Sequence, residues 1–102
     1  MNVLLLNPPH PTRLMRRYVA SYNAVNFLMP PLELLGLAGI LKEWKGRRAQ
    51  LLDAVAEGLD EEQTLKEVEQ LRPDLVVSLI GFRAFKNDVE FLGRIKKELP
   101  GT

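Results

Sequence analysis

The residues that decide the fold stand at positions 3–9 and read Val-Leu-Leu-Leu-Asn-Pro-Pro. A short, continuous apolar run of this kind is typical of a strand that is buried on both faces of a sheet. The two prolines end the run, because each lacks the backbone N–H that a sheet ladder needs. The stretch therefore predicts a central strand close to the N-terminus.

Strand and helix patterns alternate along the rest of the chain. We expect helices over residues 30–44 and 60–71, a last helix that ends at Pro100, and strands over residues 49–53 and 75–80. Such alternation is typical of a parallel sheet with right-handed crossover connections. The sequence therefore predicts an α/β, Rossmann-like (flavodoxin-like) three-layer fold with strand order 2-1-3.

Local signals refine the helices. The first helix is expected to be deeply packed, because apolar side chains cover most of its circumference. Gly36 and Gly39 share a face that a neighbouring backbone can approach closely, and Gly46 is expected to cap the helix end. Asp60 and Gln63 have the spacing of a capping box, which marks the start of the second helix.

A long segment over residues 10–30 separates the first strand from the first helix. Loops of this length are uncommon inside compact domains and are often binding loops or lids, although an insertion without a ligand is the alternative. We expect a helical turn around residues 14–20. Arg13, Arg16 and Arg17 make the segment basic, so it is either a solvated loop or an anion site.

The length and the strand count bound the architecture. A chain of 102 residues forms one domain at most. We expect residues 1–102 to be a single partial domain, because doubly wound sheets usually have about five or six strands and a fourth would begin beyond Thr102. The third strand then lacks its outer neighbour, and an apolar strand at an edge can pair with a second copy to give a homodimer.

The composition of the chain argues against several kinds of site and partner. The chain has no cysteine, which excludes disulfides, thiolate metal ligands and iron–sulfur ligation within it. No apolar stretch approaches the ~20 residues of a membrane span, and no basic leader precedes the first strand, so we expect a cytoplasmic protein that contacts no membrane. A net charge of +1 gives no nucleic-acid footprint. His10, the single histidine, is expected to be an exposed loop residue without a catalytic or metal-binding role.

Ligands of open parallel sheets bind beyond the carboxyl ends of the strands. No glycine-rich phosphate loop follows the first strand, but these ends carry an amide, an acid, a hydroxyl, a glycine and apolar surface. Such a set suits a large, partly apolar, neutral-to-anionic ligand rather than bond-making chemistry, and the acid can meet a ligand hydroxyl. The alternative is that these residues simply end strands. The candidate ligand-binding residues are Asn7, Pro8, Pro9, Asp53, Ser78 and Gly81.

Four segments, taken in order and spacing, resemble a known family. They are residues 3–9, Pro-Pro-Leu-Glu-Leu-Leu-Gly-Leu-Ala-Gly-Ile-Leu-Lys-Glu-Trp at 30–44, Leu-Leu-Asp-Ala at 51–54 and Arg-Pro-Asp-Leu-Val at 72–76. Together they resemble the N-terminal cobalamin-binding domain of cobalamin-dependent radical SAM enzymes. That group includes the anaerobic Mg-protoporphyrin IX monomethyl ester oxidative cyclase and related methyltransferases.

The resemblance implies a cobalamin-binding module that is not catalytic alone. It implies that Asn7, Pro8 and Pro9 form a loop over the corrin and that Ser78 and Gly81 lie along the same rim. The implied partners are the corrinoid and the remainder of a parent chain, which would carry S-adenosylmethionine and the iron–sulfur cluster. The Asp-x-His-x-x-Gly motif is absent, so the resemblance implies no lower axial histidine. A different reading is a non-catalytic Rossmann-like interaction module that dimerises through the third strand.

Overall fold

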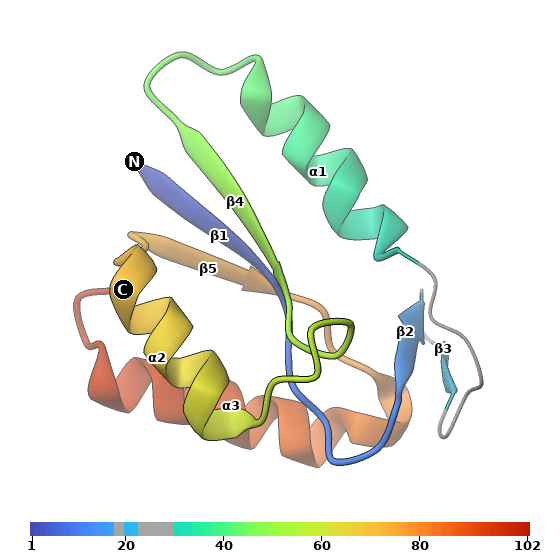
Figure 1. The fold of residues 1–102 in the computed structure, drawn as a ribbon. Coiled ribbons are helices and arrows are strands. Elements are labelled where there is room, and N and C mark those ends of the chain that lie inside the picture. The colour runs from blue at the N-terminus through green and yellow to red at the C-terminus, as the bar shows by residue number, and fades with distance from the viewer. Residues whose placement is uncertain (18–19, 23–29) are drawn as a thin grey trace.

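The fold is organised around one parallel sheet. The computed structural model describes residues 1–17, 20–22 and 30–102. In this part of the chain, three parallel strands form the sheet, with helix α1 on one face and helices α2 and α3 on the other (Figure 1). The predicted α/β fold of Rossmann-like type is confirmed.

The first strand is central, as its unbroken apolar run predicts. The strands, in their order across the sheet, are β4 (Arg48–Asp53), β1 (Asn2–Asn7) and β5 (Leu75–Ser78). Both pairings are parallel, and their register places Leu5 between Leu51 and Val77. The predicted order 2-1-3 is therefore confirmed, and residues 3–7 are all buried.

The two faces of β1 belong to two separate hydrophobic clusters. The helices are α1 (Leu32–Lys42), α2 (Glu61–Leu71) and α3 (Phe85–Glu98), the last preceded by the short helix η1 (Phe82–Ala84). On one face, Leu4 and Leu6 pack with Leu65 of α2 and Phe91 of α3. On the other face, the cluster of buried residues includes Leu34 of α1. Alternate residues of a strand point to opposite faces, which is why the apolar run of β1 contributes residues to both clusters.

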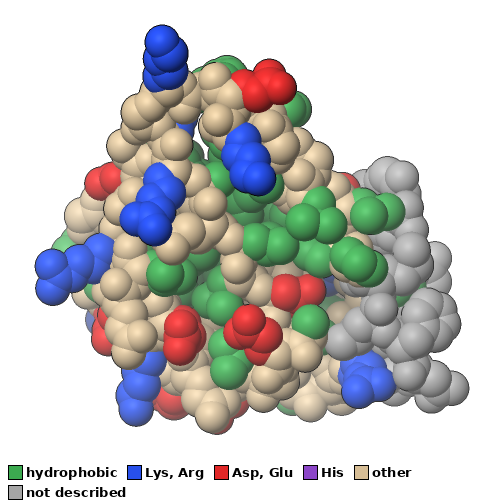
Figure 2. All heavy atoms as spheres, turned by 45° about the horizontal axis from the view of Figure 1, so that its top comes forward, with side chains coloured by type: hydrophobic (Ala, Val, Ile, Leu, Met, Phe, Trp, Pro, Cys, Tyr) green, Lys and Arg blue, Asp and Glu red, His purple; other side chains and the backbone are tan. Residues whose placement is uncertain are grey.

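Helix α1 is less buried than its sequence predicts, and the expectation of deep packing is wrong. Only Leu34 of this helix is fully buried, whereas Leu35 and Ile40 are 43% and 57% exposed. Hydrophobic side chains accordingly gather across the middle of the face in Figure 2. The reason is that, in the described part of the chain, α1 covers its face of the sheet alone.

The glycines of this region also differ from expectation. A Cβ added at Gly36 or Gly39 would meet no described atom within 4 Å, so the predicted close backbone approach is absent from the described residues. Gly46 has a left-handed φ of +78° but lies in the turn that follows the helix, since the C-cap is Glu43. The predicted cap at Gly46 is therefore wrong by three residues.

The capping box of α2 is confirmed. The Gln63 N–H donates to Asp60 Oδ1 at 2.8 Å, and the Asp60 N–H donates to Gln63 Oε1 at 3.0 Å. These bonds satisfy backbone donors that the first turn of a helix otherwise leaves unpaired. The helix ends at Arg72, whose φ of 46° is left-handed.

Residues 10–30 contain strand structure where a helical turn was expected. Strands β2 (Met15–Arg17) and β3 (Ala20–Tyr22) pair antiparallel. Leu14 and Arg16, both buried, are two residues apart, which is the period of a strand, and residues 15–17 form a strand in place of the expected helical turn. Residues 18–19 and 23–29 of the predicted loop or lid lie outside the described residues. Within the described ranges, none of the helices has the length and apolar character that crossing a membrane requires.

Candidate ligand site at the carboxyl ends of the strands

Polar side chains at the ends of β1 and β4 bond to each other. Asn7 Nδ2 donates to Asp53 Oδ1 at 2.8 Å, and the same carboxylate oxygen accepts the Ala56 N–H at 3.1 Å. The Ala54 N–H donates to the carbonyl of Asn7 at 3.0 Å. Parallel strands end at the same edge of a sheet, so the amide and the acid meet as the topology requires.

Arg16 extends this network into the interior. Its Nε donates to Asp88 Oδ2 at 2.9 Å and its Nη2 to Asp88 Oδ1 at 2.5 Å, which makes a bidentate ion pair. Both side chains are essentially buried, 1% and 0% exposed. Arg16 Nη1 also donates to Asn7 Oδ1 at 3.0 Å and to the Pro8 carbonyl at 2.8 Å. Arg16 is therefore neither a solvated loop residue nor an open anion site, since its charge is already neutralised inside the fold.

The third strand joins the same network through backbone. The Gly81 N–H, beyond the end of β5, donates to Asp88 Oδ2 at 2.9 Å. Ser78 does not take part, because its Oγ donates to the neighbouring Leu79 carbonyl at 2.9 Å. The ends of β1, β4 and β5 are thus tied together by a network that includes Asn7, Asp53 and Gly81.

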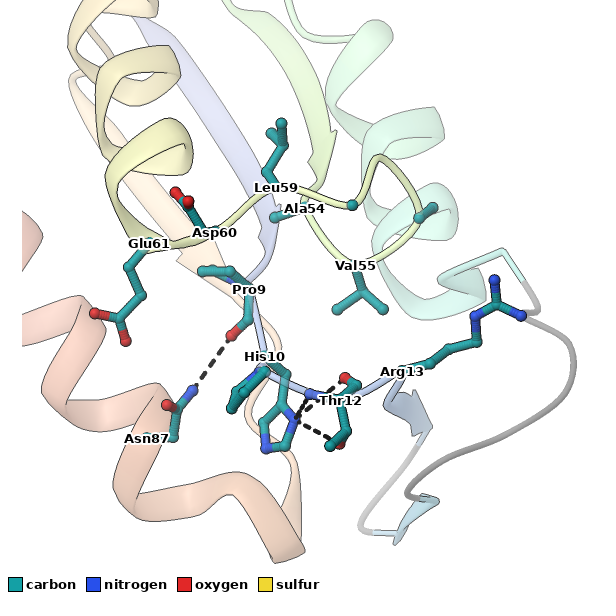
Figure 3. A pocket seen from close by; sticks show the side chains of 13 residues that line it. Pro9, His10, Thr12, Arg13, Ala54, Val55, Leu59, Asp60, Glu61 and Asn87 are labelled. Carbon is teal, nitrogen blue, oxygen red and sulfur yellow. Dashed lines mark hydrogen bonds between the residues drawn. The ribbon is translucent and has the colours of Figure 1, made fainter.

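A cavity of about 560 Å³ lies beside this network (Figure 3). Its walls are residues 9–13 after β1, residues 54–56 and 58–60 between β4 and α2, Glu61 of α2 and Asn87 of α3. This volume falls within the roughly 300–1,000 Å³ of small-molecule pockets. Of the six predicted site residues, only Pro9 lines the cavity, and contact of the other five with a ligand stays a prediction.

The walls mix apolar and polar groups, and several of the polar groups are engaged. Val55 and Leu59 contribute apolar surface, and Val55 points across the cavity toward the segment after β1 (Figure 3). Asp60 accepts from the first turn of α2, so this helix end has no uncompensated attraction for an anion. Asn87 Nδ2 donates to the Pro9 carbonyl at 3.2 Å. Arg13 and Glu61 add charged groups of opposite sign, so the cavity combines apolar contact with polar groups.

His10 also lines the cavity and is half-buried rather than fully exposed. The Thr12 N–H donates to His10 Nδ1 at 3.2 Å, and the Thr12 hydroxyl lies 3.0 Å from the same nitrogen. The Thr12 carbonyl lies 3.3 Å from this nitrogen as well, so Nδ1 accepts from or donates to Thr12 according to the ring tautomer. Across the described ranges, no three His, Asp or Glu side chains are grouped so that they could hold a metal ion.

Sequence reasoning missed Arg16 and Asp88 as parts of this edge. A signal existed in each case. Asp88 lies on the row of α3 that also carries Phe91 and Ile95, so it is an acid on the buried side of an amphipathic helix. Arg16 lies two residues after buried Leu14, at the period of a strand.

Comparisons with known proteins add no relative: no family model, no curated protein and no solved structure matches the chain. The class of protein is therefore defined by the fold and by the geometry at the carboxyl ends of the strands. The chain is an α/β unit of doubly wound type, with a ligand-sized cavity at the carboxyl ends of β1 and β4.

Proposed function

We propose that this chain is a cobalamin-binding module of a radical SAM enzyme and that it is not catalytic by itself. One observation carries the proposal: the 560 Å³ cavity lies at the carboxyl ends of the strands, where open parallel sheets bind ligands. It adjoins Pro9, which belongs to the Asn7-Pro8-Pro9 stretch on which the family resemblance rests. The partners in this proposal are a corrinoid and the remainder of a parent chain, and the location is the cytoplasm.

The cavity fits part of cobalamin rather than all of it. Cobalamin is larger than the drug-sized ligands that fill pockets of this volume. The residues that would hold it are Val55 and Leu59, through apolar contacts, with the His10 imidazole as a polar contact. Asn7 and the other network residues bond within the protein instead.

The chemistry in this proposal is divided between the cofactor and the chain. Bound cobalamin supplies methyl-transfer or one-electron chemistry at its cobalt. The residues of this chain bind and orient the cofactor and exclude water from its apolar surface. His10 would contribute a polar contact at the cavity wall, where Thr12 fixes the orientation of its ring. S-adenosylmethionine, the iron–sulfur cluster and the substrate of a cyclase or methyltransferase belong to other parts of the parent chain.

A visible-absorption titration with hydroxocobalamin tests this function. We expect a saturable, stoichiometric spectral change with the wild-type chain. Val55→Trp, which fills the cavity, is expected to weaken binding by at least about tenfold, the equivalent of ~1.4 kcal/mol. Val89→Trp is the matched control, because Val89 is 42% exposed on α3 and does not line the cavity. Absence of uptake would contradict the proposed function, and equal uptake by Val55→Trp would contradict this site.

A second candidate function is non-catalytic dimerisation through β5. This strand pairs only with β1 among the described strands, and its sequence Leu-Val-Val-Ser has none of the lysines or prolines that protect free edges. Leu75 is 45% exposed, and a groove of about 250 Å³ lies between β5 and α3. An added strand from a second copy would place alternate side chains into this groove.

Sedimentation velocity tests the dimerisation candidate. We expect a dimer that Leu75→Lys dissociates and that exposed Gln70→Lys on α2 leaves intact, because only the first change puts a charge on the free edge. A monomer at all concentrations would contradict this candidate. A dimer that survives Leu75→Lys would contradict the edge as its interface.

A further inference from the structure

The segment that walls the cavity is bonded at one end to a buried guanidinium whose residue follows its other end in the chain. Residues 9–13 line the cavity, between Pro8 on one side and Leu14 on the other. Pro8 is held through its carbonyl by Arg16 Nη1 at 2.8 Å, and Leu14 is fully buried, 0% exposed. Arg16 itself follows this segment in β2, so a single side chain bridges the two ends of the loop.

The guanidinium reaches further than these two ends. It bonds to Asp88 of α3 through two N–H groups and to Asn7 of β1 through a third, and Asp88 in turn accepts the Gly81 N–H. A planar fork with five N–H donors can satisfy these acceptors in fixed directions, which a lysine ammonium cannot do. The position of residues 9–13 is thereby fixed relative to β1, to α3 and to the segment that follows β5.

A buried ion pair is weak evidence for net stabilisation. Replacing a buried ion pair by apolar side chains of similar volume is often neutral or stabilising, because desolvation of both charges offsets their attraction. Apolar side chains cannot, however, bond to Asn7 Oδ1 and the Pro8 carbonyl. The Arg16 guanidinium therefore fixes the orientation of Asn7 and Pro8, next to the cavity.

We propose that Arg16 is a positioning residue, which shapes the ligand cavity before any ligand arrives by holding residues 9–13 against the sheet edge. A second tie, from Asn87 Nδ2 to the Pro9 carbonyl at 3.2 Å, is neutral and longer. Loss of the Arg16 fork frees the segment at its Pro8 end while the sheet and its two hydrophobic clusters persist. The identity of the ligand as a corrinoid rests on the proposed function, but the positioning role does not.

Two variants separate positioning from folding. Arg16→Met/Asp88→Leu removes both charges together, so that neither is left buried without a partner. Arg16→Lys keeps the charge and removes the fork. The matched control is Arg94→Gln/Glu62→Gln, which removes an ion pair between α3 and α2 on the surface, where Arg94 and Glu62 are 32% and 67% exposed. Circular dichroism identifies which variants fold.

Limited trypsin digestion measures the freedom of the segment without any ligand. Cleavage after Arg13 requires the chain around buried Leu14 to open locally. We expect this cleavage to be at least about tenfold faster in both Arg16 variants, the factor that corresponds to losing hydrogen bonds to a charged group. Cleavage after Lys66 in α2 is expected to stay at the wild-type rate, and the control variant is expected to match the wild type at both positions.

A parallel hydroxocobalamin titration distinguishes the two proposals. Faster cleavage after Arg13 together with at least about tenfold weaker cofactor binding by Arg16→Lys supports the positioning role. Faster cleavage with no cofactor uptake by the wild type keeps the positioning role and overturns the corrinoid ligand. Unchanged cleavage after Arg13 in the folded Arg16 variants overturns the positioning role, whatever the titration gives.

Discussion

The two faces of the sheet are covered very differently by their helices. Within the described residues, the face with Leu4 and Leu6 packs against both α2 and α3, whereas the face with Val3 and Leu5 packs against α1 alone. Yet α1 is the most apolar of the three helices and buries only Leu34 completely. The burial of these three helices therefore follows the number of helices on their face of the sheet rather than their apolar content.

The starts of the helices do not follow this division. Helix α2 begins with a full capping box, whereas α3 on the same face begins at Ala84 and α1 begins at Pro31, both without a side-chain cap bond among the described residues. The capping box is therefore a feature of α2 rather than of its face. Because the two faces differ in packing, substitutions on them should differ in their cost, and four substitutions are given in order of decreasing effect.

The largest effect is expected for Phe91→Ala, in the cluster under α2 and α3. Phe91 is 1% exposed, and removing its ring leaves a cavity that two packed helices cannot fill by a small shift. Core substitutions of this kind cost about 3–5 kcal/mol in the free energy of unfolding. Urea denaturation followed by circular dichroism measures it, and a loss below about 1 kcal/mol would contradict the tight packing of this face.

A matched leucine pair compares the two faces directly. Leu65 of α2 and Leu34 of α1 are 4% and 3% exposed. Leu→Ala costs about 2–5 kcal/mol, more where the surroundings cannot relax. We expect Leu65→Ala in the upper half of that range and Leu34→Ala near ~2 kcal/mol, because α1 is free to settle onto the sheet. Equal losses in urea denaturation would refute the difference between the faces.

Removal of the capping box is expected to cost less. Asp60→Ala leaves the Gln63 N–H without its side-chain acceptor, and such changes cost about 0.5–2 kcal/mol. Exposed Glu67→Ala, in the same helix, is the control and should change the unfolding free energy by no more than about 0.5 kcal/mol. If thermal unfolding shifts equally for both, the cap does not stabilise α2.

The smallest effect is a gain. Gly36→Ala places a methyl group where no described atom lies within 4 Å, and alanine is preferred over glycine in a helix by up to about 1 kcal/mol. Gly93→Ala provides the same change on α3, where a Cβ likewise meets no described atom. We expect both to raise the melting temperature. A fall for Gly36→Ala alone would show that a backbone does approach this face of α1.

Much of the fold follows from local sequence. The run at residues 3–9 predicts the central strand, and the Asp60–Gln63 spacing predicts the start of α2. The β2–β3 pair was missed because its strands have only three residues each, so their periodicity is too short to recognise. The exposure of α1 was missed because a sequence pattern indicates which residues are apolar but not how many elements lie beside them.

The position of the site in the fold is predictable from the sequence, but the hydrogen bonds of its side chains are not. Topology alone predicts that the residues after β1, β4 and β5 meet at one edge. It does not predict that Asn7 and Asp53 bond to each other, nor that Arg16 reaches Asp88, 72 positions away in the sequence. These pairings depend on the direction of each side chain in space. Polar residues predicted to face a ligand therefore turned out to satisfy one another.

The most direct test of the proposed cavity is a two-dimensional amide NMR spectrum recorded while hydroxocobalamin is added. We predict shifts that concentrate on the amides of residues 10, 12–13 and 54–61, around the cavity, with the amides of residues 75–78 in β5 unchanged. Shifts centred on β5, or no shifts at saturating cofactor, would contradict a corrinoid site at the carboxyl ends of β1 and β4.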